Sequence, residues 1–347
     1  MRTAYTPSSK IPTFPGLTPG QADMLLVALL VLGGGTALTS LLWLQTLTPA
    51  SPVSTFATLL FWLSLSCFLL LSYAAVIEPH LLVINRKTLK SALPAGLRIA
   101  VAADMHVGPF KGKTFIERLV RRINALKPDL ILLPGDFLFD ETAPIDDLAP
   151  FKKLHAPLGV FAVAGNHDAG NYLSLLGKPY SKNDRTDELE AFLGALGIPL
   201  LRNACQILQH TSGNFVLAGI DDLWSPSCDL AGCLNKAKPD LPLLLLSHNP
   251  DVVLDERSLR ADLIVSGHLH GGQMRLPFIG ALKVPALLSP RYAQGLFRFG
   301  ERTQLLVTRG AGETLVRARL FCWPEIVLLT TATEHKGNKE NQGMKGM

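Results

Sequence analysis

The sequence predicts an α/β domain that follows a pair of membrane-spanning helices. Hydrophobic residues make up 48% of the 347 positions, and much of this excess lies in the first 80 residues. From about Leu97 the pattern changes to short apolar runs that alternate with amphipathic stretches, as in α/β and other layered folds. A chain of this length suits one large catalytic domain with an extra module, or two ordinary domains.

Two N-terminal stretches are apolar, uncharged and long enough to cross a membrane. Met24 to Leu47 and Thr55 to Ile77 each exceed the roughly 20 residues that a helix needs to cross a bilayer core. The link, Thr48 to Ser54, is short and contains two prolines, so we expect a transmembrane hairpin. The expected organisation is an N-terminal segment over 1–23, the hairpin over 24–80, a catalytic domain over 81–331 and a polar, disordered tail over 332–347.

Basic residues on both sides of the hairpin predict its orientation. They are Arg2 and Lys10 before the first stretch, and Arg86, Lys87, Lys90 and Arg98 after the second. Because positive flanks stay on the cytoplasmic side, both flanks and the catalytic domain are expected there. The first stretch is too long for the h-region of a signal peptide and lacks a compact basic n-region.

The charge and cysteine content exclude some classes of partner and site. The net charge of +5 is mild and no run of like charge resembles a nucleic-acid-binding arm, so no nucleic acid partner is expected. The basic stretch of Arg118, Arg121 and Arg122 is typical of a solvated helix face, with anionic lipid headgroups as the other candidate partner. The five cysteines form no four-ligand zinc motif and require no oxidising compartment.

The elements of the catalytic domain follow in order along the chain. A helix is predicted where apolar residues recur on one face, and strands where short apolar runs end in polar residues. The predicted helices are Thr114–Leu126 and Glu188–Leu196. The predicted strands are Leu97–Asp104, Asp129–Asp136, Gly159–Asp168, Asn214–Asp222, Leu241–His248, Ala261–His268, Gln304–Gly310 and Glu325–Thr331.

Five of these strands end in side chains that bind metals. The blocks are DMH (Asp104, His106), GD (Gly135, Asp136), GNHD (Gly165–Asp168), SH (Ser247, His248) and GHLH (Gly267–His270), and they hold five of the nine histidines. One such block alone could equally be a capped strand end. Together they predict a metal site, because Asp, Asn and His are poor core residues unless they are paired or metal-bound. Oxygen and imidazole ligands without thiolate favour Mn, Fe or Zn in an open catalytic site.

This ordered set resembles that of the calcineurin-like metallophosphoesterases. The longer elements GHLHGGQ (Gly267–Gln273), GIDD (Gly219–Asp222), SHNPD (Ser247–Asp251) and CWPEIVLL (Cys322–Leu329) are similar to those of its membrane-associated bacterial branch. That branch contains the YkuE- and YaeI-type phosphodiesterases and the UDP-2,3-diacylglucosamine hydrolases of lipid A synthesis. The resemblance covers about Arg98 to Leu329 and implies two packed β-sheets flanked by helices.

The resemblance also implies roles for single residues. Asp104, His106 and His270 would bind one divalent metal ion, and Asn166, His248 and His268 the other, with Asp136 bridging the pair; Mn is expected, with Fe or Zn as alternatives. His167 would contact the phosphoryl oxygen or protonate the leaving group, with Asp168 as its orienting partner. The chain departs from the family pattern at Asp140, which falls one residue late for GDxxD, and at Leu269, which replaces the threonine of GHTH.

The expected function is hydrolysis of phosphodiester or pyrophosphate bonds at the bacterial inner membrane, with the domain in the cytoplasm and membrane lipids as partners. UDP-2,3-diacylglucosamine, cleaved to lipid X and UMP, is the specific candidate substrate. Alternatives are another lipid- or nucleotide-linked phosphodiester and a non-catalytic metal-binding scaffold. Ala169–Gly177 could receive acyl chains or be a packing segment. Arg275, Arg291 and Arg309 could bind a second phosphate or be surface charges.

Overall fold

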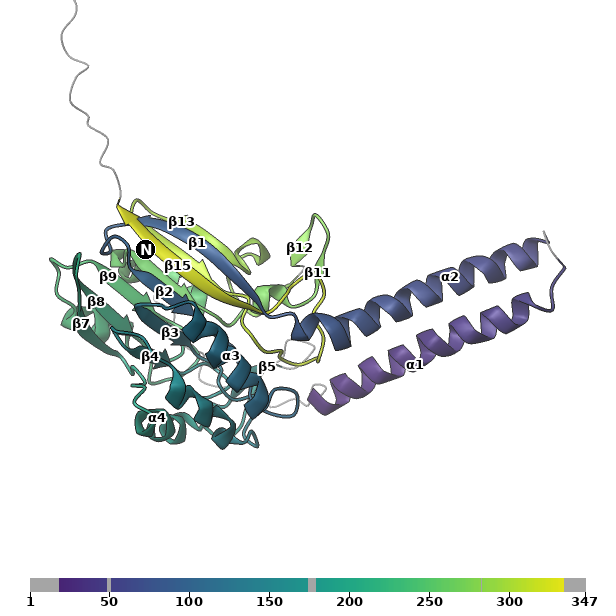
Figure 1. Ribbon diagram of the computed structural model, residues 1–347, viewed down its shortest axis with the longest axis horizontal. Helices are drawn as coiled ribbons and strands as arrows, with labels where there is room; N and C mark the ends of the chain where they lie inside the picture. The colour runs from purple at the N-terminus through teal and green to yellow at the C-terminus, as the bar shows by residue number, and fades with distance from the viewer. Residues whose placement is uncertain (1–18, 49–50, 174–178, 282, 334–347) are drawn as a thin grey trace, which may run out of the picture.

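Two long helices leave the catalytic domain at one end. The computed structural model describes residues 19–48, 51–173, 179–281 and 283–333. Helices α1 (Pro19–Leu44) and α2 (Pro52–Ser72) lie side by side as a hairpin (Figure 1). By length and composition both could cross a membrane, and only 11% and 17% of their most apolar windows are buried. This exposure distinguishes them from core helices of a soluble domain, which would be mostly buried.

The catalytic domain is built on two mixed β-sheets. The first has the strand order β1-β15-β2-β3-β4, and the second has the order β13-β14-β10-β9-β8-β7. Strands β2, β3 and β4 run parallel, as do β8, β9, β10 and β14. The bounds are β1 (Val83–Ser91), β2 (Arg98–Val101), β3 (Leu130–Pro134), β4 (Val160–Val163), β7 (Ala204–His210), β8 (Gly213–Gly219), β9 (Leu243–Leu246), β10 (Leu263–Ser266), β13 (Gly295–Phe299), β14 (Thr303–Val307) and β15 (Glu325–Thr333).

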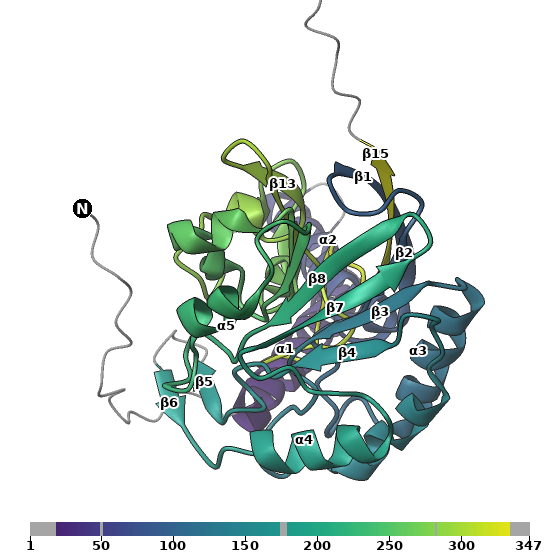
Figure 2. The same ribbon diagram turned by 90° about the vertical axis from the view of Figure 1, so that its left-hand side faces the viewer.

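Helices cover the outer faces of both sheets and complete four layers. Helices α3 (Lys113–Ala125) and α4 (Thr186–Ala195) lie against the first sheet, and α5 (Leu230–Lys236) against the second (Figure 2). Alternate residues of β3 point to opposite faces of the first sheet. Ile131 packs in the core between this sheet and the helices, whereas Leu130 and Leu132 pack in the core between the two sheets. Because the strands are buried on both faces, they are continuous apolar runs in the sequence.

The predicted strands and helices are all present, with ends shifted by a few residues. Three strands of the two main sheets and helix α5 were not predicted. Strands β7 and β13 are the two edges of the second sheet, and the edge strand β1 contains Arg86, Lys87 and Lys90, which look in the sequence only like the basic flank of the hairpin. The short hairpins β5–β6 (Asn171–Leu173, Pro179–Ser181) and β11–β12 (Arg275–Leu276, Gly280–Ala281) were also not predicted.

The helical hairpin is attached to the domain by buried polar contacts. After α2 the chain continues through a π-helical turn and a short 3₁₀ turn, Glu78–His80. The buried Glu78 carboxylate accepts hydrogen bonds from the backbone N–H groups of Phe321 and Cys322. Lys111 Nζ donates to the carbonyl oxygen of Pro79 at 2.7 Å. These bonds fix the base of the hairpin to the segment that precedes β15 and to the loop that precedes α3.

Candidate metal centre

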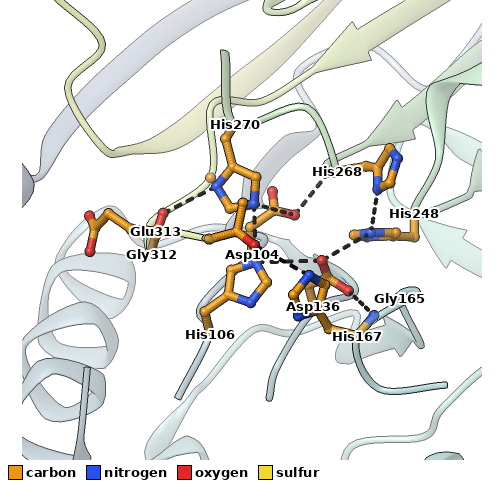
Figure 3. A network of polar contacts seen from close by, with 12 residues as sticks. Asp104, His106, Asp136, Gly165, His167, His248, His268, His270, Gly312 and Glu313 are labelled. Atoms are coloured by element: carbon orange, nitrogen blue, oxygen red, sulfur yellow. Dashed lines mark hydrogen bonds and ion pairs between the residues drawn. The ribbon is translucent and has the colours of Figure 1, made fainter. Parts of the chain in front are cut away.

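The C-terminal ends of five parallel strands meet at one edge of the sheets. There the structure brings together all the residues that were predicted as metal ligands, of which Figure 3 labels every one except Asn166. One group contains Asp104, His106, Asp136 and His270, and a second contains Asp136, His248 and His268, each with its ligand atoms within 4.8 Å of one another. Asn166 Oδ1 joins the second group, at 2.8 Å from His268 Nδ1 and 3.1 Å from His248 Nε2. Only Asp136 belongs to both groups.

The backbone at this edge is strained. Five of the clustered residues have left-handed φ angles: Asp104 (54°), His106 (46°), Asp136 (53°), His268 (71°) and His270 (49°). Such conformations are unfavourable for residues other than glycine and persist where the surrounding structure imposes them. The glycine before Asp136 is required by space, because a Cβ at Gly135 would lie 2.5 Å from His248 Nδ1. Strain of this kind concentrated in one place indicates a functional site.

Backbone carbonyls set the tautomers of three histidines. His248 Nδ1 lies 2.8 Å from the Pro134 oxygen, His268 Nε2 lies 3.0 Å from the Pro285 oxygen, and His270 Nδ1 lies 3.2 Å from the Gly312 oxygen. A carbonyl oxygen only accepts, so these outer nitrogens carry the hydrogen. The rings of His268 and His270 are neutral, so their inner nitrogens are acceptors aimed at the cluster. His248 differs, because Asp136 raises its pKa to about 10 against the effect of burial. Metal-binding histidines in proteins are held in this way.

The ligand nitrogens and oxygens that face one another are mostly acceptors without enough hydrogens to pair them. Such an arrangement suits cations. The Nε2 atoms of His106 and His270 face each other at 3.0 Å, and Asp136 Oδ2 lies 3.4 Å from Nε2 of both His106 and His248. Among the described residues, the buried Asp104 Oδ2 has no hydrogen-bond partner. The donor set therefore fits two divalent ions, one in each group, that share the Asp136 carboxylate.

Burial determines the charge of the cluster. It lowers the pKa of His106 and His270 well below their usual range and that of His268 to about 3, so these imidazoles are neutral and able to bind metal. Burial raises the pKa of Asp104 to about 7. For Asp136 burial acts in the opposite direction, but the nearby His248 and His167 hold its pKa well below the usual range. The residue common to both groups is thus a carboxylate.

His167 lies beside the metal cluster and outside both ligand groups. Its Nδ1 donates to the Phe139 carbonyl oxygen at 2.6 Å, and its Nε2 lies 3.3 Å from Thr314 Oγ1 in the cavity wall. Its ring packs edge-on against that of His106, with the centroids 4.5 Å apart. Since Nδ1 is held by a carbonyl, any proton exchanged with a substrate must be carried by Nε2.

The expected pairing of Asp168 with the His167 ring is wrong, because Phe139 takes that position. Asp168 Oδ1 accepts the backbone N–H groups of Phe137 and Leu138 at 3.0 Å, and Oδ2 accepts that of Gly165 at 2.9 Å. Asp168 is fully buried. It ties the turn after β3, which contains Asp136, to the turn after β4, which contains Asn166. Its contribution is to hold two ligand-bearing turns together.

Replacing Asp168 by Asn is therefore expected to destabilise the protein. The amide oxygen can accept from Phe137 and Leu138, but the NH₂ group then faces the N–H of Gly165, so we expect a loss of about 2–3 kcal/mol. The melting temperature of the detergent-purified chain should fall by several degrees. Asp140→Asn is the matched control, because Asp140 accepts from Thr142 through one oxygen that Asn retains. Equal melting temperatures for the two variants would contradict this role.

A cavity of about 280 Å³ opens over the cluster. Asp136, Asn166, His167, His268 and His270 lie at its metal-binding end, and its walls include Trp224, Met274, Val284, Pro285, Leu315 and Val316. Trp224 packs edge-on against the ring of His268, with the centroids 4.9 Å apart. Most of the wall is apolar, so the cavity suits a substrate that carries hydrophobic groups close to its phosphate.

The basic residue in the cavity wall is Lys283, and the sequence did not indicate it. Of the three arginines considered from sequence, Arg309 forms an ion pair with Glu325 at 2.6 Å. Arg291 lies on the ring of Tyr292, and Arg275 donates to the Gly271 oxygen. Among the residues that line the cavity, Lys283 alone is a lysine or arginine. It follows no motif, so only the fold reveals it.

The segment Ala169–Gly177 lies partly outside the described residues, which omit 174–178. In the described part, Tyr172 is buried against the His167 ring, with the centroids 4.8 Å apart. Its hydroxyl donates to the His167 carbonyl oxygen at 3.2 Å. Residues 169–173 do not contribute to the cavity lining, so this part of the segment packs against the site.

Comparison with known proteins agrees with this geometry. Residues 97–272 match the family described as calcineurin-like phosphoesterase. The chain is 32% identical to the uncharacterized metallophosphoesterase YkuE of Bacillus subtilis, with 74% of this chain and 88% of that protein covered. It is 31% identical to the UDP-2,3-diacylglucosamine pyrophosphatase LpxG of Chlamydia trachomatis (74% and 91% covered). It is 34% identical to the phosphodiesterase YaeI of Escherichia coli (68% and 82% covered).

Proposed function

The chain belongs to the calcineurin-like phosphoesterase family, and on this premise we propose that it is a dinuclear phosphodiesterase or pyrophosphatase for a lipid-linked substrate. Metal-dependent phosphoester hydrolysis is the family's chemistry, and the buried Asp/His centre suits it. The observation that carries the proposal is the sharing of Asp136 by two ligand groups, beneath a largely apolar cavity. The preferred substrate is UDP-2,3-diacylglucosamine, which would yield lipid X and UMP.

Each ligand has a proposed place in the centre. Asp104, His106 and His270 would hold one ion, Asn166, His248 and His268 the other, and Asp136 both. When bound, two divalent cations neutralise phosphoryl oxygens and lower the pKa of a nearby water. Mn²⁺ is the proposed ion, and Fe²⁺ or Zn²⁺ suits the same oxygen and imidazole donors. Asn166 contributes a neutral oxygen, which limits negative charge where the anionic phosphate must lie.

His167 is the proposed proton donor to the leaving oxygen. Its Nδ1 hydrogen is bound to the Phe139 oxygen, so Nε2 is the atom that delivers a proton into the cavity. General acid catalysis lowers the barrier most when the leaving group is a poor one. Thr314 Oγ1, 3.3 Å from Nε2, orients the ring further.

Removal of metal is expected to abolish activity and reduce stability. Incubation with EDTA should lower the hydrolysis rate at least about 100-fold, because the attacking water and the phosphate both lose their cations. The melting temperature should also fall, since ions that bind only the folded state stabilise it. Readdition of Mn²⁺, Fe²⁺ or Zn²⁺ in separate samples identifies the metal that restores both. Full activity in the metal-free protein would exclude the dinuclear centre.

Lys283 is proposed to bind the second phosphate of a diphosphate substrate. Lys283→Gln should lower kcat/KM for UDP-2,3-diacylglucosamine about five- to tenfold, which corresponds to one charge-assisted contact. Hydrolysis of bis-p-nitrophenyl phosphate, which has one phosphate, should change less than about twofold. Lys238→Gln is the matched control, since Lys238 is exposed and lies outside both the cavity lining and the β11–β12 hairpin. Equal losses on both substrates would contradict a contact to the second phosphate.

The substrate assay tests the proposed function directly. Detergent-purified full-length protein with Mn²⁺ should release UMP from UDP-2,3-diacylglucosamine, and the Asp136→Asn variant should not. If only bis-p-nitrophenyl phosphate is cleaved, the phosphoesterase chemistry stands and the lipid assignment falls. The alternative would then be another lipid- or nucleotide-linked phosphodiester.

We also propose that α1 and α2 anchor the domain at the cytoplasmic face of a bacterial inner membrane. The basic residues before α1 and in β1 support this orientation. In a single-cysteine variant, a cysteine introduced at Ser212, in the exposed turn between β7 and β8, should resist a membrane-impermeant thiol reagent in intact cells. It should react after lysis. Labelling in intact cells would reverse the orientation.

A further inference from the structure

The tip of the β11–β12 hairpin exposes large apolar side chains to solvent. Phe278 is fully exposed, Ile279 is 69% exposed, and Leu276 at the end of β11 is also exposed. Phe278 has a left-handed φ of 67°, an unfavourable conformation for an aromatic residue, and it places the ring at the very tip. A cluster of large apolar side chains at a projecting tip marks a contact surface.

The sequence around this hairpin carries only positive charge. From Leu263 to Gly300 there is no aspartate or glutamate, whereas Arg275, Lys283, Arg291 and Arg298 are all basic. Leu287, which is 70% exposed, adds a further apolar side chain to the same stretch. Apolar side chains flanked by basic ones are the combination that binds an anionic lipid surface. A protein partner with an acidic surface would match the charges but not the projecting aromatic tip.

The hairpin lies at the end of the domain from which the two long helices leave. Figure 1 shows β11 and β12 at the edge of the domain nearest α2. In the segment attached to the helix base, Phe321 and Trp323 are half-exposed, and Trp323 Nε1 lies 3.4 Å from the Tyr73 hydroxyl. Trp and Tyr concentrate at membrane–water interfaces. If α1 and α2 span the membrane, Trp323 and Tyr73 mark the level of the membrane surface. The tip of the β11–β12 hairpin then lies beside that surface.

The same hairpin forms part of the cavity wall. Met274, directly before β11, and Lys283, Val284 and Pro285, after β12, all line the cavity. The Pro285 carbonyl oxygen accepts the hydrogen bond from His268 Nε2, so this segment also positions a residue of the metal centre. An apolar tip and a cavity wall are thus parts of one continuous stretch of chain.

We propose that the β11–β12 hairpin is a second membrane contact, whose Phe278 and Ile279 enter the leaflet surface beside α1 and α2 and hold the cavity mouth at anionic lipid headgroups. The proposal rests on the membrane anchoring and lipid substrate argued under the proposed function. It adds that a substrate passes from the leaflet into the cavity along this hairpin. The hairpin therefore determines access for lipid substrates, while the metal centre carries out the reaction.

Photocrosslinking of the full-length protein tests the contact without relying on turnover. p-Benzoylphenylalanine replaces Phe278 in protein reconstituted into vesicles of phosphatidylethanolamine and phosphatidylglycerol. The control position is Ile207, which is 39% exposed on β7 at the far side of the domain (Figure 1). We expect a lipid adduct, detected by mass, at position 278 and none at position 207. Equal lipid labelling at both positions, no lipid adduct, or crosslinking to a second copy at 278 would overturn the proposal.

A double variant tests the consequence for catalysis. Phe278→Ser with Ile279→Ser should raise the apparent KM for a lipid substrate in vesicles about tenfold or more. Without these two apolar side chains, the hairpin no longer holds the mouth of the cavity at the membrane surface. Hydrolysis of soluble bis-p-nitrophenyl phosphate should be unchanged, since neither residue lines the cavity. If no lipid substrate is turned over by the unmodified protein, the proposed function fails, and the crosslinking result still decides the membrane contact.

Discussion

Asp136→Asn is expected to lower the rate of phosphodiester hydrolysis about 10³-fold or more and to leave the protein with at most one tightly bound metal ion. We expect this effect because Asp136 is the one carboxylate that belongs to both ligand groups. A neutral amide cannot offset the repulsion between two divalent cations held a few ångströms apart. Metal content is measured by mass spectrometry of the purified protein, and the rate with bis-p-nitrophenyl phosphate.

The control for this variant lies in the same loop. Asp140→Asn changes a carboxylate of similar sequence context that accepts from Thr142 through an oxygen that Asn retains, so it should retain two metals and nearly full activity. A melting curve for each variant separates loss of metal from loss of fold. Two retained metals with full activity in Asp136→Asn would mean that the ions do not share this carboxylate.

His167→Ala is expected to slow hydrolysis about 10²–10⁴-fold while two metal ions remain bound. His167 stands beside His106 but outside both ligand groups, and its Nε2 faces the cavity. The loss should depend on the leaving group. A p-nitrophenolate leaves without a proton, so its release should suffer less than release of an alkyl alcohol from a phosphodiester.

Two control variants make this result specific. His248→Ala should lose metal as well as activity, because its Nε2 lies 3.4 Å from Asp136 Oδ2. His155→Ala, at an exposed histidine away from the cavity lining, should change neither. If His167→Ala loses metal like His248→Ala, or slows good and poor leaving groups equally, the residue does not act as a general acid.

Much of the fold and the clustering of the site could be predicted from the sequence, for a simple physical reason. Parallel strands buried on both faces are recognisable as apolar runs, and their C-terminal ends meet at one edge. Asp104, Asp136 and His248 directly follow such runs, so their clustering was predictable. The edge strands were harder, because β1 pairs with β15 across more than 230 residues and its lysines resemble a solvated flank.

The contacts that orient the site could not be predicted in the same way. The Phe139 oxygen that holds His167 and the three amides that bind Asp168 are backbone groups, which every residue has. Their positions depend on how the turns after β3 and β4 pack against each other. The identity of the residues does not indicate this packing. Lys283 joins the cavity only because the chain after β12 returns past His268, which no local pattern indicates.

Anomalous diffraction from crystals of the full-length protein grown with Mn²⁺ would show whether Asp136 bridges two metal ions. We expect two peaks roughly 3.5–4 Å apart, both in contact with the Asp136 carboxylate. One should lie among Asp104, His106 and His270, and the other among Asn166, His248 and His268. A single peak, or peaks away from Asp136, would contradict it.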